Sequence, residues 1–180
     1  MPDDWQVLRD LKLRSLEQEP IAFEDPAEGK EKYEERTEQE WRDMLAGQPS
    51  GGRSGESLMV FARDEMSETY IGMVTAIVPA EQTPDHKTAT IQHMYVDNAG
   101  HRGKGVGKLL LQSLIDKIQA RGDIRRVELQ VVETQLPAIR LYSGLGFQES
   151  GRIPGGAQRG DKSYGEIEMF MELPEWDIGT

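Results

Sequence analysis

Residues 101–108 read HRGKGVGK and lie between a predicted strand and a predicted amphipathic helix. The glycines of this turn alternate, which lets the backbone approach a ligand closely. The first N–H groups of the following helix then point at that ligand, with the positive end of the helix dipole behind them. From Asn98 to Ile115 there is no acidic residue, although the chain as a whole is acidic. The turn is therefore predicted to bind an anion.

Two common phosphate-binding motifs do not fit this turn. The dinucleotide motif G-x-G-x-x-G would need a glycine at Lys108. The P-loop motif would need a glycine at Arg102 and a Ser or Thr at Leu109. What remains is R-x-x-G-x-G, formed by Arg102, Gly105 and Gly107. Taken alone, this pattern is equally compatible with a tight strand-to-helix turn that carries solubilising charges.

The segments around the turn predict an α+β fold, with a mixed and mostly antiparallel sheet of about six to seven strands and about four helices. The helix after the turn ends at Gly122 and forms a crossover, so the strands before and after it should be parallel. A loop is expected over residues 154–163, PGGAQRGDKS. The expected strands are 58–62, 70–78, 88–96, 127–131, 147–153 and 166–173, and the expected helices are 4–19, 37–45, 105–122 and 136–145.

Length and composition favour a single soluble domain over residues 1–180, because 37% of the residues are hydrophobic and 29% are charged. The net charge of -11 repels phosphate backbones, so neither nucleic acid nor a membrane is an expected partner. The chain has no Cys, and its three His lack metal-ligand spacing, so no metal is expected. The acidic N-terminus lacks the apolar segment of a signal peptide, which favours a cytoplasmic protein.

Acidic side chains are concentrated in residues 17–43, where eleven acids stand against four bases. The simplest interpretation is a solvated helical face. The functional alternative is an acidic wall beside a cationic substrate.

Residues 138–147 read AIRLYSGLGF. Together with the R-x-x-G-x-G turn, this segment resembles the two signatures of the GNAT superfamily of N-acetyltransferases, [RQ]-x-x-G-x-[GA] and A-I-x-L-Y-x-x-x-G-F. The resemblance covers about residues 58–173, and residues 5–41 are similar in layout to the family's two leading helices. It implies transfer of the acetyl group of acetyl-CoA directly to a primary amine of a small molecule or peptide.

The resemblance also implies that the two parallel strands splay apart and that acetyl-CoA lies between them. Splayed strands expose N–H and C=O groups that an amide-rich pantetheine arm can satisfy. The backbone of Met94 and Val96 would bind this arm, and Gln135 stands where the family commonly has an Asn that bonds it. The diphosphate would lie on the turn formed by Arg102, Gly103, Lys104, Gly105, Val106, Gly107 and Lys108.

Acetyl transfer needs an acid for the leaving thiolate and a base for the amine proton. Tyr142 matches the family's general-acid position, with a core tyrosine as the structural alternative. Two candidates for the base stay open, namely Glu133 at the end of one parallel strand and His93 on the other. The family often has Glu at a related place, but the nearest residues here, Thr90 and Gln92, cannot serve.

Other functions are compatible with the same motifs. A catalytically silent acyl-CoA-binding or sensing module would keep the turn without needing an acid or a base. A transferase for a longer acyl group is a third hypothesis. For the enzyme, the acidic segment favours a cationic acceptor such as a polyamine, an aminoglycoside or a basic peptide, and the final strands could pair across a homodimer.

Overall fold

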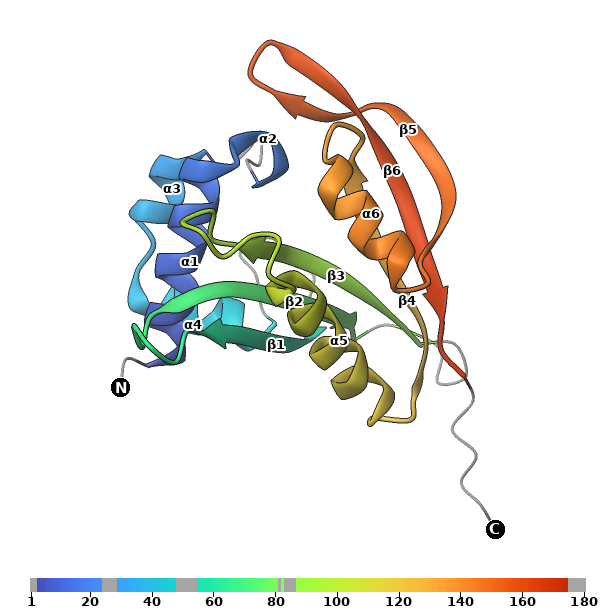
Figure 1. The fold of residues 1–180 in the computed structure, drawn as a ribbon, viewed down its shortest axis with the longest axis horizontal. Helices are drawn as coiled ribbons and strands as arrows, with labels where there is room; N and C mark the ends of the chain where they lie inside the picture. Colours follow the sequence, from blue (N-terminus) through green and yellow to red (C-terminus); the bar gives the residue numbers. More distant parts are fainter. Residues whose placement is uncertain (1–2, 24–28, 48–54, 81, 83–86, 175–180) are drawn as a thin grey trace.

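A six-stranded sheet with helices on both faces forms the centre of the computed structural model, which describes residues 3–23, 29–47, 55–80, 82 and 87–174 (Figure 1). The strand order is β1-β2-β3-β4-β6-β5, and only the β3–β4 pair is parallel. The strands are β1 (Gly55–Arg63), β2 (Tyr70–Pro79), β3 (Lys87–Val96), β4 (Ile124–Val132), β5 (Gln148–Arg159) and β6 (Lys162–Glu172). The helices are α1 (Asp4–Gln18), α2 (Pro20–Phe23), α3 (Lys30–Glu34), α4 (Glu38–Leu45), α5 (Val106–Gln119) and α6 (Leu136–Gly144). The predicted fold class is confirmed.

Each face of the sheet carries its own apolar core. On one face, α5 packs Leu111 and Leu114, both fully buried, against the central strands. On the other face, α1 and α4 bury Leu8, Leu11 and Trp41 together with residues of β2 and β3. The 3.6-residue spacing of these side chains therefore determines which side of each helix meets the sheet.

The parallel strands separate after a short paired segment. Residues 87–90 of β3 pair with residues 124–128 of β4, and no pairing follows, although β3 continues to Val96 and β4 to Val132. The separation leaves the backbone of residues 91–96 without a partner strand on the β4 side. The middle of the sheet therefore opens, as the resemblance implied.

Strand β3 also contains a β-bulge opposite β2. Thr75 is opposite Gln92 and Met73 is opposite Tyr95, so one residue of β2 faces two of β3. His93 lies in the bulge with φ 51, a left-handed conformation that is uncommon for a residue other than glycine. Bulges re-aim side chains and are often found beside functional sites.

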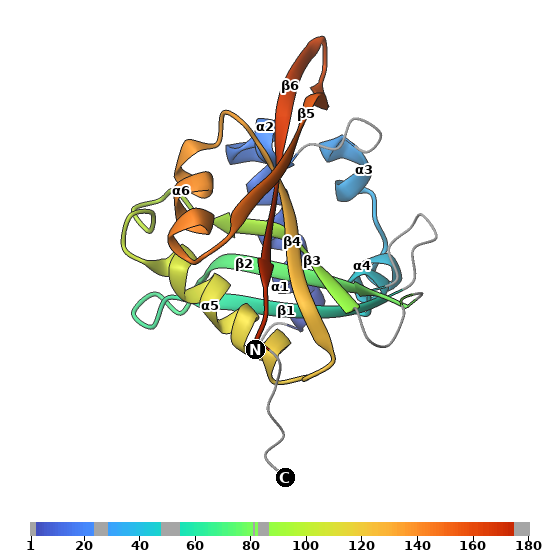
Figure 2. The same ribbon diagram turned by 90° about the vertical axis from the view of Figure 1, so that its right-hand side faces the viewer.

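The chain differs from the sequence prediction in two places. Two short helices, α2 and α3, add to the expected set. The expected loop at residues 154–163 is wrong, since β5 and β6 continue through it to a turn at Gly160 and Asp161 (Figure 2). A register shift between Ile153 and Ala157 absorbs Pro154 and the glycines, which an edge strand tolerates.

None of the helices in the described ranges is long and apolar enough to cross a bilayer.

Candidate functional site

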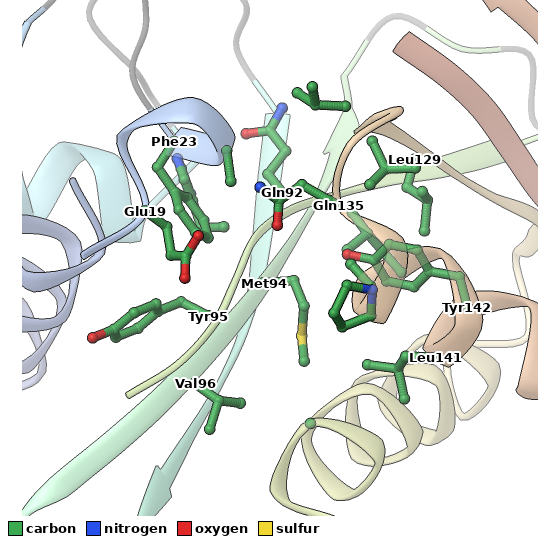
Figure 3. Close-up of a pocket in the computed structure, with 18 of the residues that line it drawn as sticks. Glu19, Phe23, Gln92, Met94, Tyr95, Val96, Leu129, Gln135, Leu141 and Tyr142 are labelled. Carbon is green, nitrogen blue, oxygen red and sulfur yellow. The ribbon is translucent and has the colours of Figure 1, made fainter. Parts of the chain in front are cut away.

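A cavity of about 810 Å³ opens where β3 and β4 separate (Figure 3). Met94 and Val96 of β3 lie on one side of it, and Tyr142 and Leu141 of α6 lie opposite. The glycine turn closes one end. We call the acceptor end the part of the cavity lined by residues of the N-terminal helical segment (Lys12, Glu19, Phe23 and Tyr33), of β3 (His93) and of the β5–β6 hairpin (Arg159 and Glu166). The candidate cofactor residues on the cavity wall are Met94, Val96, Arg102, Gly103, Gly105, Gly107, Lys108 and Gln135.

The glycines of the turn have conformations that explain their presence. Gly103 has φ 76, and Gly105, the N-cap of α5, has φ 83. Both values lie in the left-handed region, which only glycine adopts at little cost. At Gly107 a Cβ atom would lie 3.2 Å from Met94 Cε and 3.3 Å from Leu141 Cδ2. Glycine there lets α5 pack closely against β3 and α6.

The side chain of Arg102 ties the turn to its neighbours. Its Nε donates to the carbonyl oxygen of Val96 at 2.9 Å, and its Nη1 pairs with Glu19 Oε1 at 2.5 Å. The guanidinium therefore connects the turn both to the end of β3 and to the segment between α1 and α2. The other candidates from the turn, Lys104 and Val106, are not among the residues that line the cavity.

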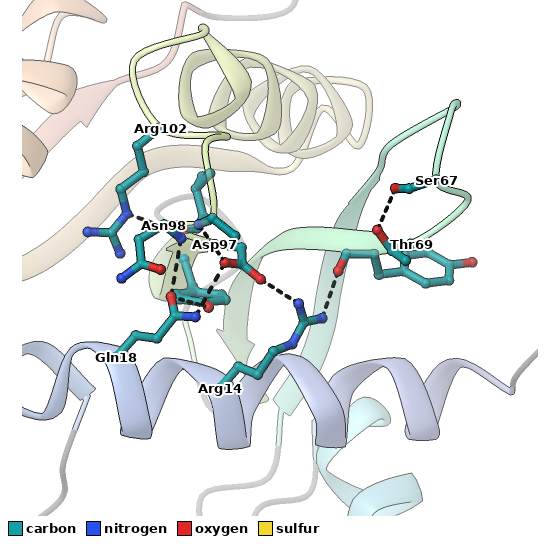
Figure 4. A network of polar contacts seen from close by, with 11 residues as sticks. Arg14, Gln18, Ser67, Thr69, Asp97, Asn98 and Arg102 are labelled. Atoms are coloured by element: carbon teal, nitrogen blue, oxygen red, sulfur yellow. Dashed lines mark hydrogen bonds and ion pairs between the residues drawn. The ribbon is translucent and has the colours of Figure 1, made fainter.

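A buried carboxylate holds the start of the turn against α1 (Figure 4). Asp97 is 6% exposed and accepts hydrogen bonds from Arg14 at 2.6 Å, from Gln18 at 3.3 Å and from the N–H of Ala99 at 2.9 Å. Burial raises the pKa of Asp97, but these hydrogen bonds outweigh it and hold the pKa below its usual value. Gln18 also accepts from the hydroxyl of Tyr95 at 2.8 Å. Helix α1 is thus joined by polar contacts to the turn.

Tyr142 lies inside the cavity wall with its hydroxyl available. Its ring is 6% exposed and packs against Phe147, with 5.9 Å between the ring centroids. Burial raises the pKa of the Tyr142 phenol, so the group keeps its proton at neutral pH. Among the described residues, the hydroxyl has no hydrogen-bond partner. The structure therefore places a protonated donor at the cavity, without the partner expected of a purely structural tyrosine.

The two candidate bases have different positions. His93 lines the cavity, and its Nδ1 lies 3.3 Å from Thr75 Oγ1. Burial, and then the positive charges of Lys12 and Arg36, hold the pKa of His93 well below its usual value, so the ring is neutral at pH 7. Glu133 does not line the cavity, and its Oε1 accepts a hydrogen bond from the N–H of Gly165 at 2.9 Å.

Several residues of the acceptor end were not foreseen from the sequence. Lys12 is 2% exposed, and its Nζ lies 4.7 Å from the centroid of the Tyr33 ring and 5.6 Å from that of Phe23. A signal was present, because Lys12 follows Leu8 by four residues and precedes Leu16 by four, which places it on the apolar face of α1. Within the described part of the acidic segment, Glu19 is the only acid that lines the cavity.

The β5–β6 hairpin reaches the same end of the cavity. Arg159 Nε donates to the carbonyl oxygen of Ile21 in α2 at 2.8 Å, and both Arg159 and Glu166 line the cavity wall. The sequence prediction missed Arg159 because it fell in the expected loop. In the described ranges, no three His, Asp or Glu side chains gather where they could hold a metal ion.

Comparisons with known proteins agree on one family. A model of the acetyltransferase (GNAT) family matches residues 12–147. Streptothricin acetyltransferase of Streptomyces lavendulae is 29% identical over 129 residues, which cover 69% of this chain and 66% of that protein. Human N-acetyltransferase 8B is 33% identical over 88 residues, which cover 49% of this chain and 38% of that protein. The aligned regions thus span less than two thirds of both relatives.

A solved structure with the same fold is that of a spermidine N-acetyltransferase from Vibrio cholerae in complex with CoA and spermine. Its TM-score is 0.67 at 19% sequence identity, and the alignment covers 96% of this chain and 91% of that chain.

Proposed function

We propose, because the chain belongs to the acetyltransferase (GNAT) family, that it is an acetyl-CoA-dependent N-acetyltransferase that acetylates a primary amine of a small molecule or peptide. The observation that carries the proposal is the cavity between the separated strands β3 and β4, which has the glycine turn at one end and Tyr142 on its wall. An acetyltransferase needs both the turn and the phenol, because the turn can bind the diphosphate and the phenol can protonate the leaving thiolate.

The residues on the cavity wall fit acetyl-CoA. Beyond the paired segment, the β4-facing backbone groups of β3 have no partner strand among the described residues, and they suit the amides of a pantetheine arm. Met94, Val96 and Gln135 would hold this arm. The N–H groups at the start of α5, with Lys108 beside them, would hold the diphosphate. When bound, acetyl-CoA supplies the activated acetyl group.

Tyr142 is proposed as the general acid. It would donate its phenolic proton to the sulfur as the C–S bond breaks, and the raised pKa keeps that proton in place beforehand. The lack of a structural hydrogen-bond partner for its hydroxyl within the described residues favours this role over a silent acyl-CoA-binding module. His93 and Glu133 are the proposed alternatives for the base.

The acceptor is proposed to be a cationic amine. The Glu166 carboxylate lines the cavity and would attract an ammonium group, whereas Glu19, also on the cavity wall, is paired with Arg102. Among the relatives, a spermine/spermidine N(1)-acetyltransferase of Bacillus subtilis is named for a polyamine. Polyamines, aminoglycosides and basic peptides are therefore the first acceptors to test.

The proposal is tested by incubating the full chain with acetyl-CoA and a panel of these amines while free thiol is measured. Thiol release that depends on one class of amine is the expected result. If acetyl-CoA bound in calorimetry but no amine released thiol, the silent binding module would replace the enzyme.

We further propose that residues 1–180 act as one cytoplasmic domain and form a homodimer. Light scattering after size-exclusion chromatography would give the mass in solution, and a monomer at all concentrations would contradict the dimer.

A further inference from the structure

The bulge in β3 places His93 beside a buried hydroxyl. Thr75 is 1% exposed and lies on β2, opposite Gln92 across the bulge. Its Oγ1 lies 3.1 Å from the carbonyl oxygen of Gln92 and 3.3 Å from Nδ1 of His93. The left-handed φ of 51 at His93 is a conformation that a histidine adopts only when its surroundings require it.

The hydrogen bonds around Thr75 determine which nitrogen of His93 carries the proton. A hydroxyl has one hydrogen, and a carbonyl oxygen can only accept. If the Thr75 hydroxyl donates to the Gln92 carbonyl, its oxygen must accept from His93, so Nδ1 carries the hydrogen. Any other assignment leaves one of the two contacts without a hydrogen. A neutral imidazole with Nδ1–H has an unprotonated Nε2.

The surroundings of His93 favour a neutral ring with a free acceptor. Lys12 of α1 and Arg36, which follows α3, both place positive charge near it. Both also lie over the Tyr33 ring, whose centroid is 4.7 Å from Lys12 Nζ and 4.4 Å from Arg36 Cζ. These charges and burial hold the pKa of His93 well below its usual value. Among the described residues, Nε2 has no hydrogen-bond partner.

We propose that Thr75 is a positioning residue that holds His93 in the Nδ1–H tautomer, so that His93 Nε2 acts as the general base of the acetyl transfer. This inference rests on the proposed function and chooses between the two bases left open there. Glu133 is less suited, because its Oε1 accepts from the Gly165 N–H and the residue lies outside the cavity wall.

The amine nitrogen forms a bond to the carbonyl carbon of the thioester, and its attached proton becomes acidic as the nitrogen gains positive charge. His93 Nε2 takes that proton. The C–S bond then breaks, and the sulfur takes the phenolic proton of Tyr142. Transfer of the proton from the imidazolium to the phenolate through solvent restores both groups, and the products are the amide and the free thiol.

The test compares Thr75→Val with Thr75→Ser in the full chain. Valine keeps the branched shape and removes the hydroxyl, whereas serine keeps the hydroxyl and removes one methyl group. We expect Thr75→Val to lower kcat about 10- to 100-fold, the ratio that one buried hydrogen bond supports, with the KM for acetyl-CoA unchanged. Thr75→Ser should retain most of the activity. His93→Gln should lower kcat at least as far as Thr75→Val does.

Nitrogen-15 NMR of the histidine side chains gives a readout that does not depend on turnover. The His93 signals are assigned by their loss in His93→Gln. In the wild type at pH 7 we expect a protonated Nδ1 and an unprotonated Nε2, and in Thr75→Val a shift of the proton toward Nε2. The same spectra, together with thermal melting, show whether the valine variant is folded.

The outcomes separate the two proposals. Absence of turnover by the wild type on every amine would overturn the proposed function, and the base with it. Wild-type turnover with equal kcat in Thr75→Val and Thr75→Ser, or a wild-type spectrum with protonated Nε2, would overturn the present inference alone.

Discussion

At the scale of single residues, the proposed general acid can be removed at Tyr142 without disturbing the packing of its ring. Tyr142→Phe keeps the ring against Phe147 and deletes only the hydroxyl. We expect kcat to fall about 10²- to 10⁴-fold, which is the usual contribution of a general acid. Acetyl-CoA affinity, measured by calorimetry, should stay within about twofold of the wild type. Equal turnover of the two proteins would remove Tyr142 from the mechanism.

The turn allows an equally local test. Gly105→Ala puts a side chain on a residue with φ 83, although open space surrounds the position. The strain of a left-handed alanine, about 1–2 kcal/mol, favours relaxation of the free turn to another conformation. Binding would have to restore the left-handed conformation, so acetyl-CoA affinity should weaken about 5- to 30-fold. Gly144→Ala is the matched control, since that position in α6 is also open and needs no positive φ. Similar calorimetric affinities for the two variants would argue against binding at the turn.

The structural role of a residue could be predicted from the sequence where only one residue type meets a local requirement. Gly105 belongs to the R-x-x-G-x-G motif and Gly103 to the glycine-rich turn around it, and the positive φ of both residues is a physical reason for glycine at these positions. Thr75 carried no such signal, because a threonine is common in strands and its partner His93 is brought to it only by a bulge. Lys12 did carry a signal, since its spacing from Leu8 puts a charge among apolar neighbours.

At the scale of elements, the short parallel pairing of β3 and β4 is stabilised at its start by a charge cluster. Asp123, just before β4, pairs with Lys87 of β3 at 2.7 Å and with Arg121 at 3.1 Å. Arg121 first, and then Lys87, hold the pKa of the Asp123 carboxyl well below its usual range. A depressed pKa means that the stabilisation is present above the unfolded pKa of about 3.9 and is lost as the pH falls through the folded pKa.

We therefore expect Asp123→Asn to lower the free energy of unfolding at pH 7 by about 0.5–1 kcal/mol, a value reduced for the partial exposure of the cluster. The difference from the wild type should shrink as the pH is lowered below about 4. Urea unfolding at several pH values measures this. Asp161→Asn, at the exposed β5–β6 turn, is the control and should show little change. If the difference in free energy of unfolding between the wild type and Asp123→Asn grew as the pH fell, the depressed pKa of Asp123 would be contradicted.

The prediction of elements succeeded where periodicity continues and failed where it is interrupted. The helix after the turn and the strands beside it follow regular apolar spacing, and all of them are present. The stretch around Pro154 and Gly155 reads as a loop because these residues are rare inside strands. In the structure they belong to β5, an edge strand in which a register shift accommodates them.

At the scale of the whole molecule, the fold is open where a cosubstrate is proposed to bind, so binding should stabilise it. A ligand at 100 times its Kd adds about 2.7 kcal/mol to the free energy of unfolding, which raises the Tm of a chain of this size by about 5–10 °C. We expect this shift with acetyl-CoA and a much smaller one with acetate at the same concentration. Differential scanning fluorimetry measures the Tm shift. Equal shifts with acetyl-CoA and acetate would argue against specific binding of acetyl-CoA in the cavity.

The hydrogen bond between Arg159 and the Ile21 carbonyl joins segments 138 residues apart in the sequence. The acceptor end therefore combines residues of the N-terminal helical segment with residues of the β5–β6 hairpin. The middle of the chain supplies the glycine turn. A change of acceptor would thus depend on paired changes in two segments that are distant in the sequence, residues 12–33 and residues 159–166. A chimera that takes only one of these two segments from a related protein should lose the contact between Arg159 and Ile21. A chimera that takes both segments should show the acceptor preference of that related protein.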